Sequence, residues 1–166
     1  MSEKLGITRS SFYNAFGSRE QLFDAALALY SEVSPDRAFK VATPDSPVKQ
    51  LFTDTFRLVC KVRAEDGEAR GCLAVNGVTQ LCGTNAVIGP KLEAAMLGNV
   101  TRIETILGWG VARGELSEDT DIHALALSIK TLLVGLNVIC KLVRDEDELW
   151  LMCSTTLGGL NLLEGG

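Results

Sequence analysis

The chain has 166 residues, which is enough for one ordinary core or for a small domain joined to a larger one. Hydrophobic residues make up 46% of it and charged residues 22%, a balance that excludes an intrinsically disordered protein. The net charge of −5 argues against a nucleic-acid binder held by overall charge alone. It leaves room for a local reader of nucleic acid, because Lys4, Arg9 and Arg19 cluster near the N-terminal end.

The sequence carries no pattern that predicts export or a membrane span. No basic segment followed by an apolar stretch and a cleavage site opens the chain. The apolar run 124–143 is interrupted by Ser128, Lys130, Asn137 and Lys141, so we expect no membrane partner. The five cysteines are an odd number without a CxxC spacing, which favours reduced thiols over a disulfide framework. We therefore expect a cytoplasmic protein.

The first 33 residues have the pattern of a helix-turn-helix. Gly6 suits the tight turn after a short helix, and Thr8 is a good N-cap for the next one. That helix has room for about two turns before Gly17, and most of its side chains can form hydrogen bonds. Ser18 then caps a longer helix, which ends before Pro35. A short polar helix between two turns is typical of proteins that read the major groove of DNA.

The same residues resemble the TetR/AcrR family of bacterial transcriptional repressors. The motifs that match its recognition helix and flanking turns are Leu5-Gly6-Ile7-Thr8, Phe12-Tyr13-Asn14-Ala15-Phe16 and Ser18-Arg19-Glu20-Gln21-Leu22-Phe23. The family often has a histidine where Ala15 stands, so we expect one DNA contact to be absent.

The family's DNA-binding domain has three helices, and this chain begins near the end of the second. The chain is therefore a fragment, or its start is assigned too late, or it has lost DNA binding. The residues encoded upstream of Met1 would discriminate among these three alternatives.

Hydrophobic periodicity predicts further helices along the chain. We expect a loop over 34–46 with one turn near 37–40, followed by a helix that Ser46 caps, with Pro47 at its first position. Later helices are predicted over 47–63, 71–82, 89–113 (with Gly114 as the C-cap), 121–143 and 149–163. The segment 71–82 is apolar almost all round, which predicts a short buried helix. Its motif Arg70-Gly71-Cys72-Leu73-x-Val75-Asn76 also resembles the start of the equivalent helix in many TetR-family ligand domains.

These elements predict an all-α fold. Residues 1–33 would form a partial helix-turn-helix domain with its connecting helix, and residues 34–166 an antiparallel helical ligand-binding and dimerisation domain. The helix over 121–143 is apolar on two faces, and its second face contains Leu127, Val134, Val138 and Leu142. The last helix carries small residues that permit close approach: Ser154, Thr155, Gly158 and Gly159. We expect these last two helices to form a homodimer.

Catalytic and metal-binding patterns are missing from the sequence. His123 is the only histidine, and we expect it to be solvated near a helix start. The cysteines lack metal-ligand spacing, and Gly158-Gly159 follows no strand that would make it a phosphate loop. We therefore expect no enzyme, no metal site and no cofactor.

Polar side chains on the otherwise apolar helices suggest a site for a small-molecule effector. The candidate ligand-binding residues are Cys72, Asn76, Thr79, Gln80, Arg102, Trp109 and Asn137, with Lys130 of the same character. The alternative is that most of these residues face the dimer seam or solvent. Cys72 also raises the hypothesis of an electrophile sensor, because a helix N-terminus favours a thiolate. The alternative for this residue is an inert buried cysteine.

The sequence thus predicts a homodimeric repressor that binds operator DNA and is released by a largely apolar ligand. Arg9 and Ser11 would reach base edges, and Ser10, Tyr13, Asn14 and Arg19 would hold phosphates. Thr8 and Ser18 complete the candidate DNA-binding set as the caps of the two helices. The alternative function is a ligand-binding and dimerisation module that no longer binds DNA.

Overall fold

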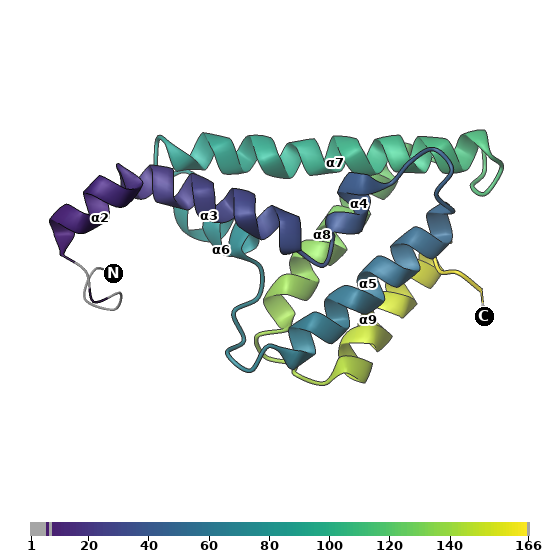
Figure 1. Ribbon diagram of the computed structural model, residues 1–166. Coiled ribbons are helices and arrows are strands. Elements are labelled where there is room, and N and C mark those ends of the chain that lie inside the picture. Colours follow the sequence, from purple (N-terminus) through teal and green to yellow (C-terminus); the bar gives the residue numbers. More distant parts are fainter. Residues whose placement is uncertain (1–5, 7, 166) are drawn as a thin grey trace.

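The computed structural model describes residue 6 and residues 8–165, and within this part the chain is entirely helical (Figure 1). The helices are α2 (Arg9–Phe16), α3 (Arg19–Val33), α4 (Arg37–Val41), α5 (Val48–Glu65), α6 (Leu73–Leu81), α7 (Ile88–Ala112), α8 (Ile122–Ile139) and α9 (Glu146–Gly159). The predicted all-α fold is therefore confirmed.

Helix α7 runs along the length of the molecule, as Figure 1 shows. Helix α8 packs against it, and α5 and α9 lie side by side beyond α8. At the other end α2 extends away from the helical body, and α3 leads from α2 back toward α4 and α6. Helix α2 and the C-terminal end of α9 lie at opposite ends of the molecule, so the predicted DNA-reading helix is far from the last helix turn (Figure 1).

The hydrophobic core lies among α5, α7, α8 and α9. The large side chains that are completely buried there include Phe52, Phe56, Ile106, Leu107, Leu136 and Leu157. The buried residues of α5 recur at helical spacing, so they form an apolar stripe that faces the other three helices. Burying so much apolar area is the main force that holds these helices together.

Side-chain caps fix where four of the eight described helices begin. The hydroxyl oxygens of Thr8 and Ser18 accept hydrogen bonds from backbone N–H groups in the first turns of α2 and α3. The carboxylates of Asp121 and Asp145 do the same for α8 and α9. These contacts satisfy donors that have no partner inside the helix.

The predicted cap of α5 is wrong. The hydroxyl of Ser46 accepts a hydrogen bond from the backbone N–H of Thr43, and Pro47 precedes the helix instead of starting it. The first helical N–H, that of Val48, donates to the Glu115 carboxylate at 2.6 Å. A residue 67 positions away therefore provides this cap, which local sequence reasoning does not detect.

Four other predictions about the helices also need correction. In α6 only Val75 and Gly77 are completely buried, because one side of this helix faces solvent. Helix α8 ends at Ile139, before the expected residue 143, because the backbone turns after Cys140. Helix α9 ends at Gly159, and α7 at Ala112, with Arg113 as its C-cap and Gly114 one position later.

Candidate DNA-reading helix and effector cavity

Helix α2 presents polar side chains while one aromatic residue is buried beneath them. Phe12 is 5% exposed and packs against the rings of Tyr13 and Phe16, with ring centroids 5.5 and 5.3 Å away. The exposed candidate DNA-binding residues of this helix are Ser10, Ser11, Tyr13 and Asn14. None of the eight residues of α2 is acidic, so the helix offers no charge that would repel phosphates.

The remaining candidates for DNA contact lie at the helix ends. Thr8 and Ser18 are engaged as caps, and Arg19 is exposed at the start of α3. The side chain of Arg9 lies outside the described part of the structure, as do the whole residues Lys4, Leu5 and Ile7 of the sequence motifs.

The turn between α2 and α3 requires glycine. Gly17 has a φ of +71°, in the left-handed region that other residues rarely adopt. A Cβ atom added there would lie 1.9 Å from the Gln21 side-chain oxygen. The turn is thereby kept short, and α3 follows α2 without a flexible linker.

A cavity of about 480 Å³ lies where α3, α4, α6, α7 and α8 meet. This volume falls in the usual range for small-molecule sites. Most of its wall is apolar, with the largest side chains being Leu27, Phe39, Leu92, Met96, Ile103 and Leu133. Because Leu27 and Tyr30 belong to α3, the helix that continues from α2 also forms part of the cavity wall.

A buried arginine connects three helices at this cavity. Arg63 of α5 is 6% exposed, and its Nε donates to the Asn137 side-chain oxygen at 2.7 Å. Its Nη2 donates to the Tyr30 hydroxyl at 2.8 Å, which ties α3 to the helical body. Burial raises the pKa of Tyr30, and the neighbouring Cys72 thiol acts in the same direction. Tyr30 therefore remains a neutral phenol that accepts this bond at physiological pH.

Cys72 enters the cavity wall because of a close backbone contact. The residue before it, Gly71, has a φ of +69°, and a Cβ atom there would lie 2.7 Å from the Asn137 carbonyl oxygen. Only glycine allows the loop to approach α8 this closely. Cys72 is the N-cap residue of α6 and is 8% exposed.

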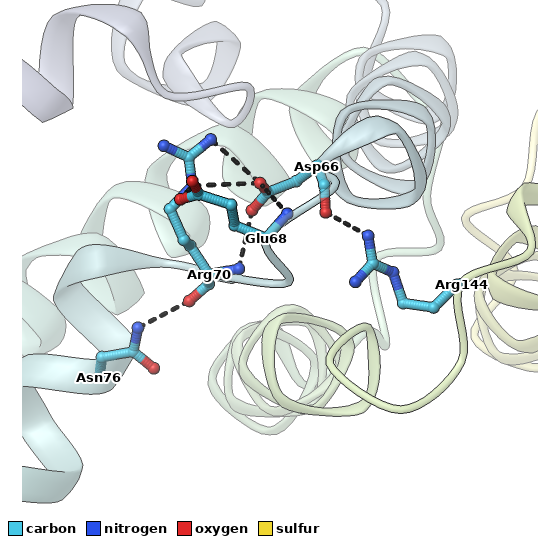
Figure 2. Close-up of polar contacts among 5 residues, drawn as sticks. All are labelled: Asp66, Glu68, Arg70, Asn76 and Arg144. Carbon is cyan, nitrogen blue, oxygen red and sulfur yellow. Dashed lines mark hydrogen bonds and ion pairs between the residues drawn. The ribbon is translucent and has the colours of Figure 1, made fainter.

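The loop before Cys72 is held by the polar contacts of Figure 2. The Asp66 carboxylate accepts hydrogen bonds from the backbone N–H of Arg70, at 2.8 Å, and from its guanidinium. These bonds to Arg70 hold the pKa of Asp66 below its usual range. Arg144 donates to the Asp66 carbonyl, and the Asn76 amide donates to the Arg70 carbonyl at 2.8 Å. The loop is thus fixed on both sides.

The structure brings together only some of the predicted ligand-binding residues. Those that line the cavity are Cys72, Arg102 and Asn137, together with Lys130. Those outside its lining are Asn76, Thr79, Gln80 and Trp109. Asn76 also accepts from Lys141, the Arg102 guanidinium lies 4.9 Å from the centre of the Trp109 ring, and Thr79 and Gln80 are exposed.

Sequence reasoning did not select Tyr30 and Arg63, the two residues that join α3 to the body. The signal for Arg63 was present, because it continues the apolar stripe of Val59 and Cys60 at helical spacing. A charge on the buried face of a helix usually has a specific partner. Tyr30 gave no comparable signal, since an aromatic residue on the apolar face of a helix is expected to be an ordinary residue of the hydrophobic core.

The single histidine does not contribute to the cavity. His123 is exposed, and its Nδ1 lies 2.6 Å from the Glu104 carboxylate. In the described residues no cluster of histidine, cysteine and acidic side chains could hold a metal ion.

Comparison with known proteins relates this architecture to DNA-binding regulators. Residues 52–155, well over half of the chain, match the family model described as tetracyclin repressor-like, C-terminal domain. The uncharacterized HTH-type transcriptional regulator YezE of Bacillus subtilis (strain 168) is 27% identical over 150 residues, covering 87% of this chain and 75% of YezE. The HTH-type transcriptional repressor ComR of Escherichia coli (strain K12) is 21% identical over 156 residues, covering 93% of this chain and 74% of ComR.

Solved structures agree with these relatives. A cysteine mutant of the TetR family transcriptional regulator CifR, complexed with 26-bp double-strand operator DNA, superposes with a TM-score of 0.80 at 26% identity. The match covers 95% of this chain and 82% of that one. A putative TetR regulator from Rhodococcus sp. RHA1 shares the fold, with a TM-score of 0.66 at 24% identity and coverage of 95% and 84%. The chain therefore belongs to the TetR family of transcriptional regulators.

Proposed function

We propose that this regulator is a homodimeric repressor, which binds operator DNA through α2 and releases it when a small molecule enters the cavity. The observation that carries the proposal is the course of α3. This helix is separated from the polar helix α2 only by Gly17 and Ser18, and its C-terminal half forms part of the cavity wall. Residues 1–33 would then read DNA and residues 34–166 would bind the effector and the second subunit. The structural relative CifR, solved with operator DNA, supports the first half of this assignment.

In the proposed complex the exposed face of α2 enters the major groove. Arg9 and Ser11 would contact base edges, where hydrogen bonds distinguish the base pairs. The phosphates would be held by Ser10, Tyr13, Asn14 and Arg19. Phosphate contacts orient a protein on the duplex but carry little sequence information. Two copies of α2 would have to lie about 34 Å apart to enter successive grooves.

Release would follow from a movement of α3. Its Tyr30 is held by Arg63, and Arg63 also holds Asn137, which lines the cavity. We suppose that α3 can take two positions, one that allows DNA binding and one that does not. A ligand that contacts Tyr30 or Asn137 would bind more tightly to the protein in one of these positions than in the other. Such a difference is what shifts a two-state equilibrium. A tilt of α3 in each subunit would change the spacing of the two α2 helices.

The proposed dimer uses the apolar surface of α8 and the small residues of α9. Helix α8 is long and apolar enough to cross a membrane by length and composition, yet only 28% of its residues are buried within the chain. Leu127 and Val138 are 44% and 48% exposed, and eleven residues is close to three helical turns, so they share one face. On α9 Leu151 is 66% exposed. A second copy is the cover expected for such a surface in a soluble regulator.

Val134, which the sequence places on the same apolar face as Leu127 and Val138, lines the cavity instead. Val138 is therefore the better position for a test. We expect Val138→Glu to give monomer or aggregate, because a carboxylate cannot be buried without a partner. Leu58→Glu is the matched control, since Leu58 of α5 is 47% exposed but lies on a different helix. Sedimentation of the unmutated chain as a well-folded monomer at micromolar concentration would overturn the proposed dimer.

DNA binding is tested by selecting duplexes from a randomised library and measuring their affinity by fluorescence anisotropy. The measurement is made in parallel on a version of the chain extended upstream through its reading frame. We expect at least one version to bind DNA with an affinity that falls strongly between about 50 and 200 mM salt. Arg19→Ala should weaken all sequences about equally, while Arg9→Ala should relax base preference by about 1–3 kcal/mol if Arg9 pairs with guanine. If neither version enriches any sequence, the chain is a ligand-binding and dimerisation module that does not bind DNA.

A second candidate function for the same cavity is detection of electrophiles by Cys72. The observation that favours it is the position of this thiol in the cavity wall at the start of a helix. We expect Cys72 to react with a maleimide at neutral pH faster than Cys60, Cys140 and Cys153, which lie in the core outside the cavity. A uniformly slow reaction that needs denaturant would assign Cys72 to the inert buried cysteines.

A further inference from the structure

The cavity wall carries more positive than negative charge. The charged side chains that line it are Asp36, Arg37, Lys40, Arg102 and Lys130, so one carboxylate faces four cations. This balance is opposite in sign to that of the whole chain, whose net charge is −5. A cluster of cations inside an acidic protein therefore needs a local explanation.

Three of the four cations already have partners. Arg37 and Lys40 both form ion pairs with the Glu32 carboxylate, at 3.7 and 2.7 Å. The Arg102 guanidinium donates to the carbonyl oxygens of Phe39 and Ala42 at the end of α4. The Asp36 carboxylate accepts from Ser34. These contacts make Arg37, Lys40 and Arg102 part of the wall that holds α4 in place.

Lys130 is the exception. It lies in the middle of α8 and is partly buried, yet within the described part of the chain it forms neither a hydrogen bond nor an ion pair. Desolvation lowers the pKa of its ammonium group, while the charge of Asp36 acts in the opposite direction. A partly buried cation without a partner is costly, and its nitrogen is not enclosed by protein atoms. The Nζ donors are thus available to a molecule in the cavity.

Arg63 is a further cation next to the cavity, because both of its hydrogen-bond partners line the cavity. Arg63 is almost completely buried and forms its hydrogen bonds with Asn137 and Tyr30, which are both neutral. Neither contact neutralises the guanidinium charge. The buried guanidinium therefore adds positive potential to the part of the cavity that Tyr30 and Asn137 line.

We propose that the effector is an amphiphilic anion, with an apolar body against the hydrophobic wall and one carboxylate or similar acidic group bound by Lys130. The inference rests on the proposed function only in taking this cavity as the effector site. The apolar wall alone would admit any hydrophobic molecule. Lys130 is what selects those that bring a negative charge.

Decanoate and decan-1-ol are matched probes, because they share the alkyl chain and differ in the charged group. Their binding to the full chain is measured by isothermal titration calorimetry in the absence of DNA. We expect decanoate to bind about tenfold more tightly or better, since it pairs with a desolvated cation. Equal affinity of the two probes, or no binding of decanoate, would overturn the proposal.

Three variants assign the preference to Lys130. Lys130→Met should weaken decanoate binding about tenfold or more and leave decan-1-ol unchanged, while Lys130→Arg should keep the preference for decanoate. Lys61→Met on the exposed side of α5 is the control for the loss of one positive charge. Decanoate affinity that is unchanged in Lys130→Met would overturn the assignment. Because DNA is absent, binding of decanoate through Lys130 would stand even if the chain bound no operator.

Discussion

The α5–α9 helical body and the α2–α3 arm differ in how much of their apolar surface the chain covers. Helix α5 buries seven of its residues, including Phe52, Phe56 and Cys60 with no exposed surface. Helix α3 has fifteen residues and buries none completely, and its Leu29 and Val33 are 70% and 73% exposed. The arm carries the predicted DNA contacts, while the body carries most of the core.

This contrast indicates a division between stability and response. A region with few buried contacts opens at low free-energy cost, whereas a densely packed core opens only with global unfolding. The arm is fixed to the body at a few points: Arg63 bonds to Tyr30, and Asp24 forms an ion pair with Lys91 of α7. In the proposed mechanism, a ligand that acts on one of these points would therefore move the arm without disturbing the core.

Replacing one phenylalanine in each region should show the contrast most strongly. Phe52→Ala should lower the free energy of unfolding by about 3–5 kcal/mol, because it leaves a cavity in a core that cannot collapse around it. Phe12→Ala in α2 should cost clearly less, because its neighbours Tyr13 and Phe16 are themselves 49% and 38% exposed. Urea denaturation followed by circular dichroism measures both values. Equal losses would mean that arm and body form one cooperative unit.

Breaking the arginine contact should loosen the arm more than the body. Arg63→Met removes both donors and leaves the Asn137 and Tyr30 oxygens without them, at a cost of about 1–3 kcal/mol. This substitution should accelerate hydrogen exchange more in α3 than in α9. The control Lys61→Met, which changes an exposed cation two residues earlier, should alter the exchange of neither helix. Uniform acceleration across all helices would contradict the role of Arg63 as a local attachment.

The same contrast explains which features could be predicted from the sequence. Local patterns were sufficient for the helices themselves and for the caps at Thr8 and Ser18, since a capping side chain and the N–H group that it accepts from lie within one turn. Apolar composition alone made α6 look buried, because composition cannot tell an apolar helix at the edge of a body from one inside it. Which predicted polar residues share a cavity depends on the packing of five helices, and so Asn137 lines it while Asn76 fixes a loop.

The smallest expected effect concerns how the two regions start their helices. The caps of α2 and α3 are hydroxyl groups, whereas α5 is capped by the Glu115 carboxylate through the backbone N–H of Val48. Partial desolvation opposes ionisation of Glu115, but its bonds to the Arg113 guanidinium and the Val48 N–H outweigh this and hold its pKa below 4.5. A group whose pKa is lower in the folded state stabilises the fold above its unfolded pKa, and the contribution is lost as the pH falls through the folded value.

Glu115→Gln should therefore lower the free energy of unfolding by about 0.5–1 kcal/mol at pH 7, because a neutral acceptor replaces a charged one. The difference from the unmutated protein should narrow as the pH falls below about 4.5, where the carboxylate of the unfolded chain takes up its proton. Urea denaturation at pH 7 and at several lower pH values measures this difference. The pH dependence belongs to the body, since Thr8→Ala, which removes the hydroxyl cap of α2, should give a loss that does not change over the same range. A constant difference for Glu115→Gln would show that its charge does not stabilise α5.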